Sequence, residues 1–335
     1  MRPIWSIKLG ELDLTEQLAS YLLTLAITDA SGTAADRLQL EVADPRGIIA
    51  WPAHGTELIV ALGYAHTGLT DMGSFIVDEV RVSNPPRVIS IRGNAADFGA
   101  ERVKQRRRIH YEGQTVGALV DTLAQEMGYT AAVHPDLAAR PVPLLDRVAE
   151  SPIATVTRLA RRFDAVATVK RGHVTFVPAG VGETASGAPI PEVIIRESNC
   201  TRWSFEVMDR AKYTAAKARY RDVNAAEDVW VQAGSDASVD TNATYELRNT
   251  YPDRASAEEA ARGKIRALTR NGGSAEVTHI GDPTIGAQAP LILTGFGHRI
   301  DGRWIADEVE HRLGNDGLIT TIRAKLPVTG QPAGE

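Results

Sequence analysis

The sequence predicts a mainly β protein in which two similar antiparallel β-barrel domains, related by internal duplication, flank a small α+β module. Three observations lead to this fold class. Apolar and polar residues alternate at period two up to about residue 98 and again after residue 200, which is the spacing of half-buried strands. Between these regions the apolar spacing becomes helical. Finally, one strand sequence occurs twice, starting at Gly73 and at Gly302.

The first barrel domain is predicted at residues 1–98. Four alternating segments are separated by turn residues such as DPRG and NPP, and short strands at this spacing are typical of antiparallel barrels or sandwiches. The segments are RLQLEVAD (37–44), ELIVALGY (57–64), SFIVDEVRVS (74–83) and RVISIRGNA (87–95).

The α+β module is predicted at residues 99–178. Apolar residues within 115–129 fall at helical spacing, and Gly128 stands where that helix should end. Ser151 can cap a second helix, because its hydroxyl can accept from the first free backbone N–H groups. The segment 166–178 alternates again and indicates a hairpin.

The second barrel domain is predicted at residues 201–327, after a linker at 179–200 whose first part is rich in glycine, alanine and proline. A helix is expected within this barrel at 255–270, since its acids come early and its arginines late, as the helix dipole prefers. The last residues, 328–335, are expected to be a flexible tail.

The repeated strand carries the strongest pattern in the chain. Its neighbours recur too: LIVALGY and LILTGFG precede the two copies, and VISIRGN and ITTIRAK follow them. Three strands in the same order indicate a duplicated building block, so we interpret the shared acids as part of that block. The matched positions are Gly73 and Gly302, Ile76 and Ile305, Asp78 and Asp307, Glu79 and Glu308, and Val80 and Val309.

Composition excludes several classes of protein. The net charge is −5, so no overall basic field favours sequence-specific nucleic acid binding. No apolar run reaches the roughly 18 residues of a membrane span, and the N-terminus lacks the apolar segment of a secretory signal. The single cysteine, Cys200, rules out an internal disulfide and a cysteine-based metal cluster.

No catalytic, cofactor or metal site is predicted. The group Asp307, Glu308, Glu310 and His311 is the tempting one, but on a regular strand Asp307 and His311 would be roughly 13 Å apart. Paired carboxylates for hydrolysis of a glycan could be nominated near the middle module, among Glu101, Glu112 and Glu126. Nothing in the sequence singles these acids out.

A basic run occupies residues 101–110 and includes Arg102, Lys104 and the triplet Arg106, Arg107 and Arg108. It could contact a phosphate backbone or an acidic partner, or it could be a solvated connection leaving the first barrel. We keep the arginine triplet as a candidate interface. The absence of interleaved aromatic residues argues against stacking on single strands.

The order of these segments resembles the late control D family of contractile phage tails, the baseplate hub, which is related to the hub part of VgrG spike proteins. The resemblance covers roughly residues 5 to 327. It rests on GSFIVDEVRVS with RVISIRGNAADF, on HYEGQTVGALVDTLAQEMGY, on AESPIATVTRLARRFDAVATVKRGHVTFVPAG, and on GRWIADEVEHRLGNDGLITTIRAKLP.

The resemblance implies a structural, non-enzymatic virion component of the tail baseplate, made in the host bacterial cytoplasm. It implies a homotrimer, whose six barrels would form a pseudo-six-fold ring between the six-fold tail tube and a three-fold spike. The spike would be a separate polypeptide, and the tape measure and other baseplate proteins are further candidate partners. The alternative hypothesis is a peptidoglycan hydrolase that acts at the tail tip through the middle module.

Overall fold

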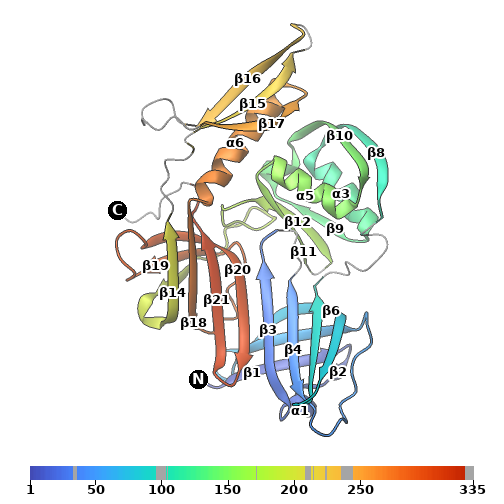
Figure 1. Ribbon diagram of the computed structural model, residues 1–335, viewed down its shortest axis with the longest axis vertical. Coiled ribbons are helices and arrows are strands. Elements are labelled where there is room, and N and C mark those ends of the chain that lie inside the picture. The colour runs from blue at the N-terminus through green and yellow to red at the C-terminus, as the bar shows by residue number, and fades with distance from the viewer. Residues whose placement is uncertain are drawn as a thin grey trace.

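The computed structural model describes residues 1–32, 36–95, 103, 105–170, 172–207, 213, 215–222, 225–234 and 244–328. It confirms the mainly β fold with an α+β insert. Figure 1 shows an elongated molecule with the N-terminal strands and a short helix at one end, the C-terminal strands beside them, and the long helices toward the other end. Arg102, Lys104 and most of the expected tail lie outside the described residues.

The N-terminal strands form the first β unit, in which each strand pairs antiparallel with its neighbours in the order β3-β4-β7-β6-β5-β1-β2. Alternate side chains enter its core, and each buried aliphatic residue contributes roughly 1.5–3 kcal/mol. In one strand, for example, Leu38, Leu40 and Val42 are buried while Arg37 and Gln39 are exposed. The elements are β1 (Pro3–Leu9), β2 (Leu12–Asp13), α1 (Thr15–Leu18), β3 (Leu22–Ala30), β4 (Arg37–Ala43), β5 (Glu57–Tyr64), β6 (Gly68–Ser83) and β7 (Val88–Asn94).

The second β unit is built from strands near the C-terminus, in the order β14-β18-β21-β20, with β19 pairing β20 and β13 pairing β19. All of these pairs are antiparallel except β13 with β19, which is parallel. The elements are β13 (Val193–Arg196), the 3-10 helix η1 (Glu197–Asn199), β14 (Cys200–Val207), β18 (Gly273–Ile280), β19 (Pro290–Thr294), β20 (Gly302–Gly314) and β21 (Gly317–Lys325).

The two units share one 13-stranded sheet, which the sequence did not predict. The reason is the length of β20. Its residues 302–305 pair with β19, and residues 308–313 continue along the same edge to pair with β3 of the first unit. The expected linker 179–200 also differs, because its end supplies η1 and β13. A parallel pairing between β13 and β19, about a hundred positions apart, leaves no local pattern in the sequence.

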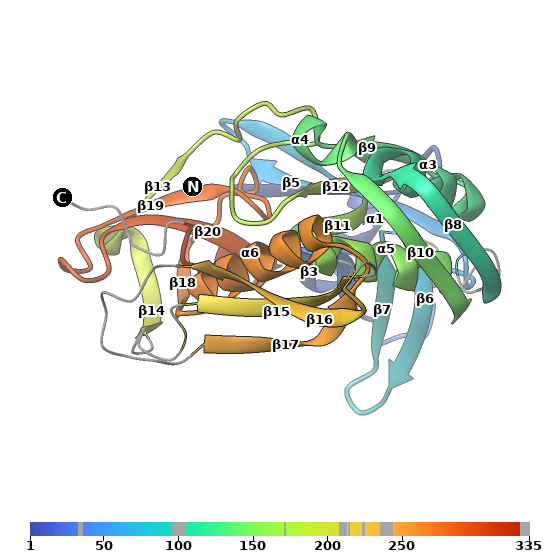
Figure 2. The same cartoon turned by 90° about the horizontal axis from the view of Figure 1, so that it is seen from above.

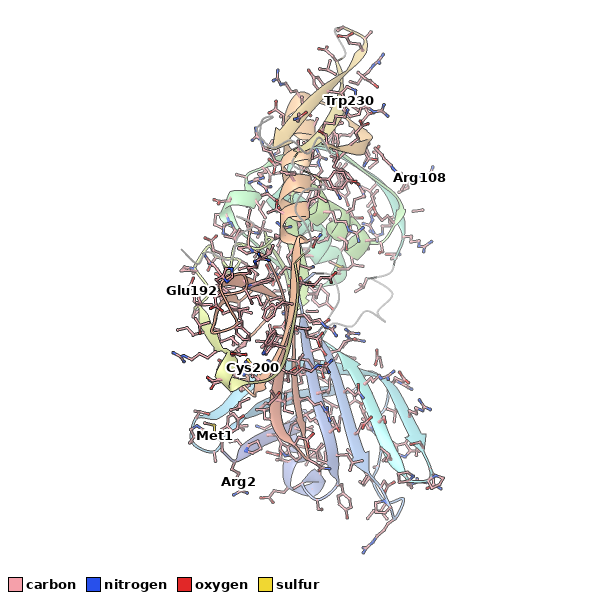
Figure 3. The ribbon with its side chains drawn as sticks, turned by 60° about the vertical axis from the view of Figure 1, so that its left-hand side comes forward. Met1, Arg2, Arg108, Glu192, Cys200 and Trp230 are labelled. Atoms are coloured by element: carbon pink, nitrogen blue, oxygen red, sulfur yellow. The ribbon has the colours of Figure 1, made fainter. Side chains whose placement is uncertain are left out.

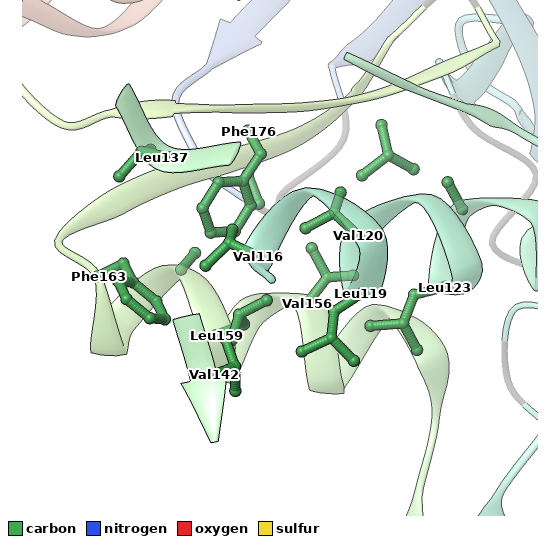
Figure 4. Packing of buried hydrophobic residues seen from close by; sticks show 14 of the residues in the cluster. Val116, Leu119, Val120, Leu123, Leu137, Val142, Val156, Leu159, Phe163 and Phe176 are labelled. Atoms are coloured by element: carbon green, nitrogen blue, oxygen red, sulfur yellow. The ribbon is translucent and has the colours of Figure 1, made fainter. Parts of the chain in front are cut away.

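The middle module packs two helices against short strands. Thr115 caps α3 (Val116–Met127) by accepting from the backbone N–H of Ala118, and Gly128 ends it with a left-handed φ of 79°. Ser151 caps α5 (Pro152–Arg162) in the same way. Figure 4 shows the apolar faces of both helices meeting Phe163 and Phe176 in one core. The other elements are β8 (Arg107–Thr115), β9 (Thr130–Val133), α4 (Pro135–Ala138), β10 (Pro141–Glu150), β11 (Ala165–Lys170) and β12 (His173–Pro178).

A separate three-stranded sheet, the inserted sheet, interrupts the second β unit. It contains β15 (Ala215–Asp222), β16 (Glu227–Gly234) and β17 (Thr244–Tyr251), with β15 in the centre. The segments of β15 and β16 were expected to be strands of the second barrel, whereas β17 was not predicted. Instead their apolar face packs on α6 (Arg254–Arg270), and Figure 2 shows that helix between the inserted sheet and the rest of the molecule.

Two groups of partly buried ion pairs connect the middle module to its neighbours. Asp164, which is 5% exposed, accepts from Arg266 Nε and Arg270 Nη1 of α6, both at 2.9 Å. At the other side Lys170 of β11 contacts Asp29 of β3 and Asp36, the latter at 3.3 Å. Because such charges would be costly to leave unpaired, both contacts resist separation of the module.

Candidate assembly surface

The two copies of the repeated strand hold the same register with the strand before them. Ile76, Phe75 and Gly73 of β6 lie opposite Glu57, Leu58 and Val60 of β5. The matched residues Ile305, Trp304 and Gly302 of β20 lie opposite Pro290, Leu291 and Leu293 of β19. Phe75 and Trp304 are both fully buried. Residues matched in sequence therefore occupy matched places in the sheet.

Both copies also contain a β-bulge at the same residue. In β6 the pairing with β7 shifts between Val77 and Glu79, so that Asp78 is the extra residue. In β20 the pairing with β21 shifts between Ala306 and Glu308, so that Asp307 is the extra residue. A bulge of this kind re-aims the strand and increases its twist. This coincidence is what a duplicated unit predicts.

The bulge gives the acidic residues their partners. Glu79 Oε2 accepts from Arg92 Nη1 at 3.0 Å, and Glu308 Oε1 accepts from Arg323 Nη1 at 2.7 Å. Each bulged aspartate contacts the residue two positions after that arginine on the next strand. Asp78 contacts Asn94, and Asp307 pairs with Lys325 at 2.6 Å. In each unit the Asp–Glu pair thus binds polar side chains of the neighbouring strand.

Because the two β units share one continuous sheet, residues from both copies of the repeated strand line the same polar hollow. Asp78, Glu79, Arg92, Glu308 and Arg323 all line it, together with Glu310 and side chains of β3 and β4. Arg37 of β4 lies 3.8 Å from Glu308, and Arg323 also donates to Glu276 at 3.1 Å, a hydrogen bond that raises the pKa of Arg323. Exposed pairs of this kind contribute about 0–1 kcal/mol each. The hollow is therefore a solvated, charged face of the sheet.

His311 has no ligand role in this arrangement, although its sequence neighbours are acidic. It is fully buried, its Nε2–H donates to the carbonyl of Ile285, and its Nδ1 accepts from the hydroxyl of Thr320, both at 3.0 Å. Burial lowers its pKa. Regular alternation after the bulge places His311 toward the core and Glu310 toward solvent. No group of three metal-ligating side chains exists among the described residues.

The three arginines of the basic run lie away from this hollow. Arg106 immediately precedes β8, and Arg107 and Arg108 begin it; all three are exposed, and Arg107 donates to the side chain of Gln105 at 2.7 Å. Figure 3 shows Arg108 at the outer margin of the middle module. Within the described residues none of the three forms an ion pair with an acid. They stay a candidate interface.

Glu112 and Glu126, the two nominated acids that the structure describes, do not form a pair. Glu126 Oε2 accepts from Arg147 Nη1 at 2.7 Å, and Arg147 is completely buried. Glu112 is exposed on β8, while its neighbour Tyr111 points inward and donates to Glu126 at 3.4 Å. Glu112 and Glu126 therefore lie on opposite sides of β8, and Glu101 lies outside the described residues.

Sequence reasoning missed the residues that complete the polar hollow. Arg92 and Arg323 occupy matched positions in VISIRGN and ITTIRAK, so the repeat itself contained this signal. Arg37 and Glu310 carried none, because their place depends on the pairing of β20 with β3. No described helix is long and apolar enough to cross a membrane.

Comparison with known proteins agrees with this fold. The sequence profile of the phage tail baseplate hub (GPD) family matches residues 82–317. The probable baseplate hub protein of Escherichia phage 186 is 27% identical over 367 aligned residues, covering 98% of this chain and 94% of that protein.

Two solved structures extend the comparison at the level of the fold. The 43 kDa tail protein of prophage MuSo2 from Shewanella oneidensis has a TM-score of 0.71 and 14% identity over 98% of this chain and 99% of that one. A chain of the Francisella PdpA-VgrG complex has a TM-score of 0.59 and 9% identity, covering all of this chain and 60% of that one. Because the family profile spans most of the sequence, this chain belongs to the phage tail baseplate hub (GPD) family.

Proposed function

We propose that the protein is a structural hub of a contractile phage tail or a tail-like injection system, and that three copies form a ring with pseudo-six-fold symmetry. One observation carries this proposal: each chain holds two units with the same strand register and the same bulge. Three chains then present six similar units. Such a ring can contact a six-fold tube with one face and a three-fold spike with the other, without leaving mismatched contacts unsatisfied.

The proposed partners are a second and third copy of the chain, tail tube proteins and a trimeric spike, and the proposed location is the virion baseplate. The charged hollow is poorly suited to close apolar contact, because burying its acids and arginines would carry a desolvation cost. Contacts with partners are therefore expected at strand edges and apolar patches, where added strands can satisfy free backbone groups.

The test is the native mass of the purified chain, measured by light scattering over a wide concentration range. A species of about three times 36.1 kDa supports the ring and justifies imaging for six similar units around its axis. A chain that stays monomeric at all concentrations and also in the presence of its spike protein contradicts the proposal.

The same preparation tests the structural role. Suspensions of bacterial cell wall should keep their turbidity in the presence of the wild-type chain. Lysis that disappears in the Glu112→Gln or Glu126→Gln variant, with the fold intact, would show an enzyme instead.

A further inference from the structure

We propose that a hollow between the two β units is a docking groove for an extended, apolar and uncharged segment of a partner polypeptide, which adds as a strand to the free edge of β13. This inference deepens the proposed function, since it rests on the chain having assembly partners and assigns one of them a place. The hollow encloses about 430 Å³ and is lined by Val193–Arg196, Ile280–Thr284 and the turn after β5, among others.

The first argument is the edge of the strand. β13 pairs with β19 along one side, from Val193 opposite Leu291 to Arg196 opposite Thr294. On the other side, no strand of the described chain pairs with it. All four residues of β13 line the hollow, as expected when the hollow follows the strand's edge. Unpaired backbone N–H and C=O groups along such an edge are a template for an incoming strand.

The second argument is the apolar rim. Ile195 points into the core of the second β unit, whereas Ile194 is 54% exposed. Ile280, at the end of β18, is 53% exposed and lines the same hollow. Two large aliphatic side chains exposed beside a free strand edge favour a segment whose alternate side chains are apolar.

The third argument is a buried polar atom without a partner. His279 is only 7% exposed, and its Nε2 has no hydrogen-bond partner among the described residues. Such an atom is costly to bury unless something bonds to it. Because this nitrogen is out of contact with solvent, a peptide N–H or C=O of the added strand can bond to it only after a small shift of the lining side chains.

The charges of the lining explain why an uncharged segment is expected. Arg196 and the amino group of Met1 bring positive charge and Asp282 brings negative charge, so the groove has only a small net field to attract an acid or a base. Tyr64, His66 and Thr70 reach the hollow from the first β unit, so the groove exists only while the two units are packed together. In Figure 3, Met1, Glu192 and Cys200, which lie in or next to the lining, are on one side of the molecule.

A binding experiment with defined peptides tests the groove. Fluorescent peptides of about twelve residues, overlapping along the sequences of the spike, tube and tape measure proteins made with this chain, are titrated with the full-length protein and followed by anisotropy. Ile194→Glu places a charge at the edge without filling the core. Ile48→Glu is the matched control, because Ile48 is 65% exposed and lies outside the hollow.

We expect at least one peptide with alternating apolar residues to bind the wild type and the I48E variant, and to bind I194E at least about tenfold more weakly, a difference of about 1.4 kcal/mol. Hydrogen exchange at Ile194–Arg196 should slow in the complex. His279→Ala should weaken binding as well, measured at a temperature where this variant is still folded, because removing a buried side chain also lowers stability.

The inference is overturned if no peptide binds at about 100 µM, if I194E binds as the wild type does, or if protection appears on another strand. The outcome is separable from the proposed ring. A trimer that binds no peptide keeps the ring and loses the groove, whereas a monomer that binds one at β13 keeps the groove and loses the ring.

Discussion

The ion pair between Glu126 and Arg147 offers a direct test of the middle module as structure rather than active site. Arg147 is completely buried, and its guanidinium donates to three acceptors. Nη1 donates to Glu126, Nε to the carbonyl of Glu150 at 2.8 Å, and Nη2 to the carbonyl of Gln105 at 3.0 Å. Among these acceptors only Glu126 is charged, so its removal leaves the buried guanidinium without a carboxylate bonded to it.

Breaking a buried pair by removing one partner costs about 3–5 kcal/mol. Glu126 is 19% exposed, which allows some solvent screening, so we expect the low end of that range, about 3 kcal/mol, for Glu126→Ala. Glu126→Gln should cost less, roughly half as much, because the amide oxygen can still accept from Nη1. Glu112→Gln, at an exposed position on β8, should stay within about 0.5 kcal/mol.

Native-state hydrogen exchange of α3 is the suitable assay, since no tryptophan lies within 99–178 to report this module by fluorescence. A loss of about 3 kcal/mol should speed the most protected amides of α3 by roughly 150-fold if they exchange through module unfolding. Unchanged protection in Glu126→Ala would refute the argument. Unchanged protection together with lost wall lysis would favour the hydrolase hypothesis.

Two further predictions concern contacts of the middle module with its neighbours, and a third concerns packing within the first β unit. Burial raises the pKa of Asp36 to about 6, so the folded chain holds that proton more tightly than the unfolded chain. The free energy of unfolding should therefore fall as the pH rises from about 4 to about 6 in the wild type, and it should fall less in Asp36→Asn. Urea titrations across this pH range will measure the difference. Asp164→Asn should cost about 2 kcal/mol and speed tryptic cleavage within α6, whereas Glu258→Gln, at an exposed pair, should not. Gly93→Ala should cost about 1–3 kcal/mol by thermal unfolding, because its Cβ would lie 2.9 Å from the carbonyl oxygen of Ile76.

Local patterns predicted the helices well, because their signals are contained within a few turns. The helical spacing within 115–129 and Gly128 correspond to α3 and its left-handed end, and α6 covers the segment 255–270. Alternation likewise located most strands. It could not say which strands pair, because period two specifies only the face on which a side chain lies.

The main errors follow from that limit. β15 and β16 alternate as barrel strands would, yet they form the inserted sheet, because their apolar face is matched to alanines of α6. The bulges at Asp78 and Asp307 shift the alternation by one residue, and neither position carries a glycine to mark it. The repeated sequence still located the acids, since a repeated sequence indicates a repeated environment even when that environment is unknown.

The bulges explain why two such different sequences can keep one geometry. Opposite the start of the bulge, the first unit pairs Val77 with Gly93, whereas the second pairs Ala306 with Ala324. A valine opposite a glycine is thus replaced by an alanine opposite an alanine, so two different pairs of side chains fill the same space between the strands. Core packing tolerates such exchanges when total volume is roughly kept. The polar contacts are more alike, because in both units the bulged aspartate contacts the last residue of the next strand's motif and the following glutamate binds that strand's arginine.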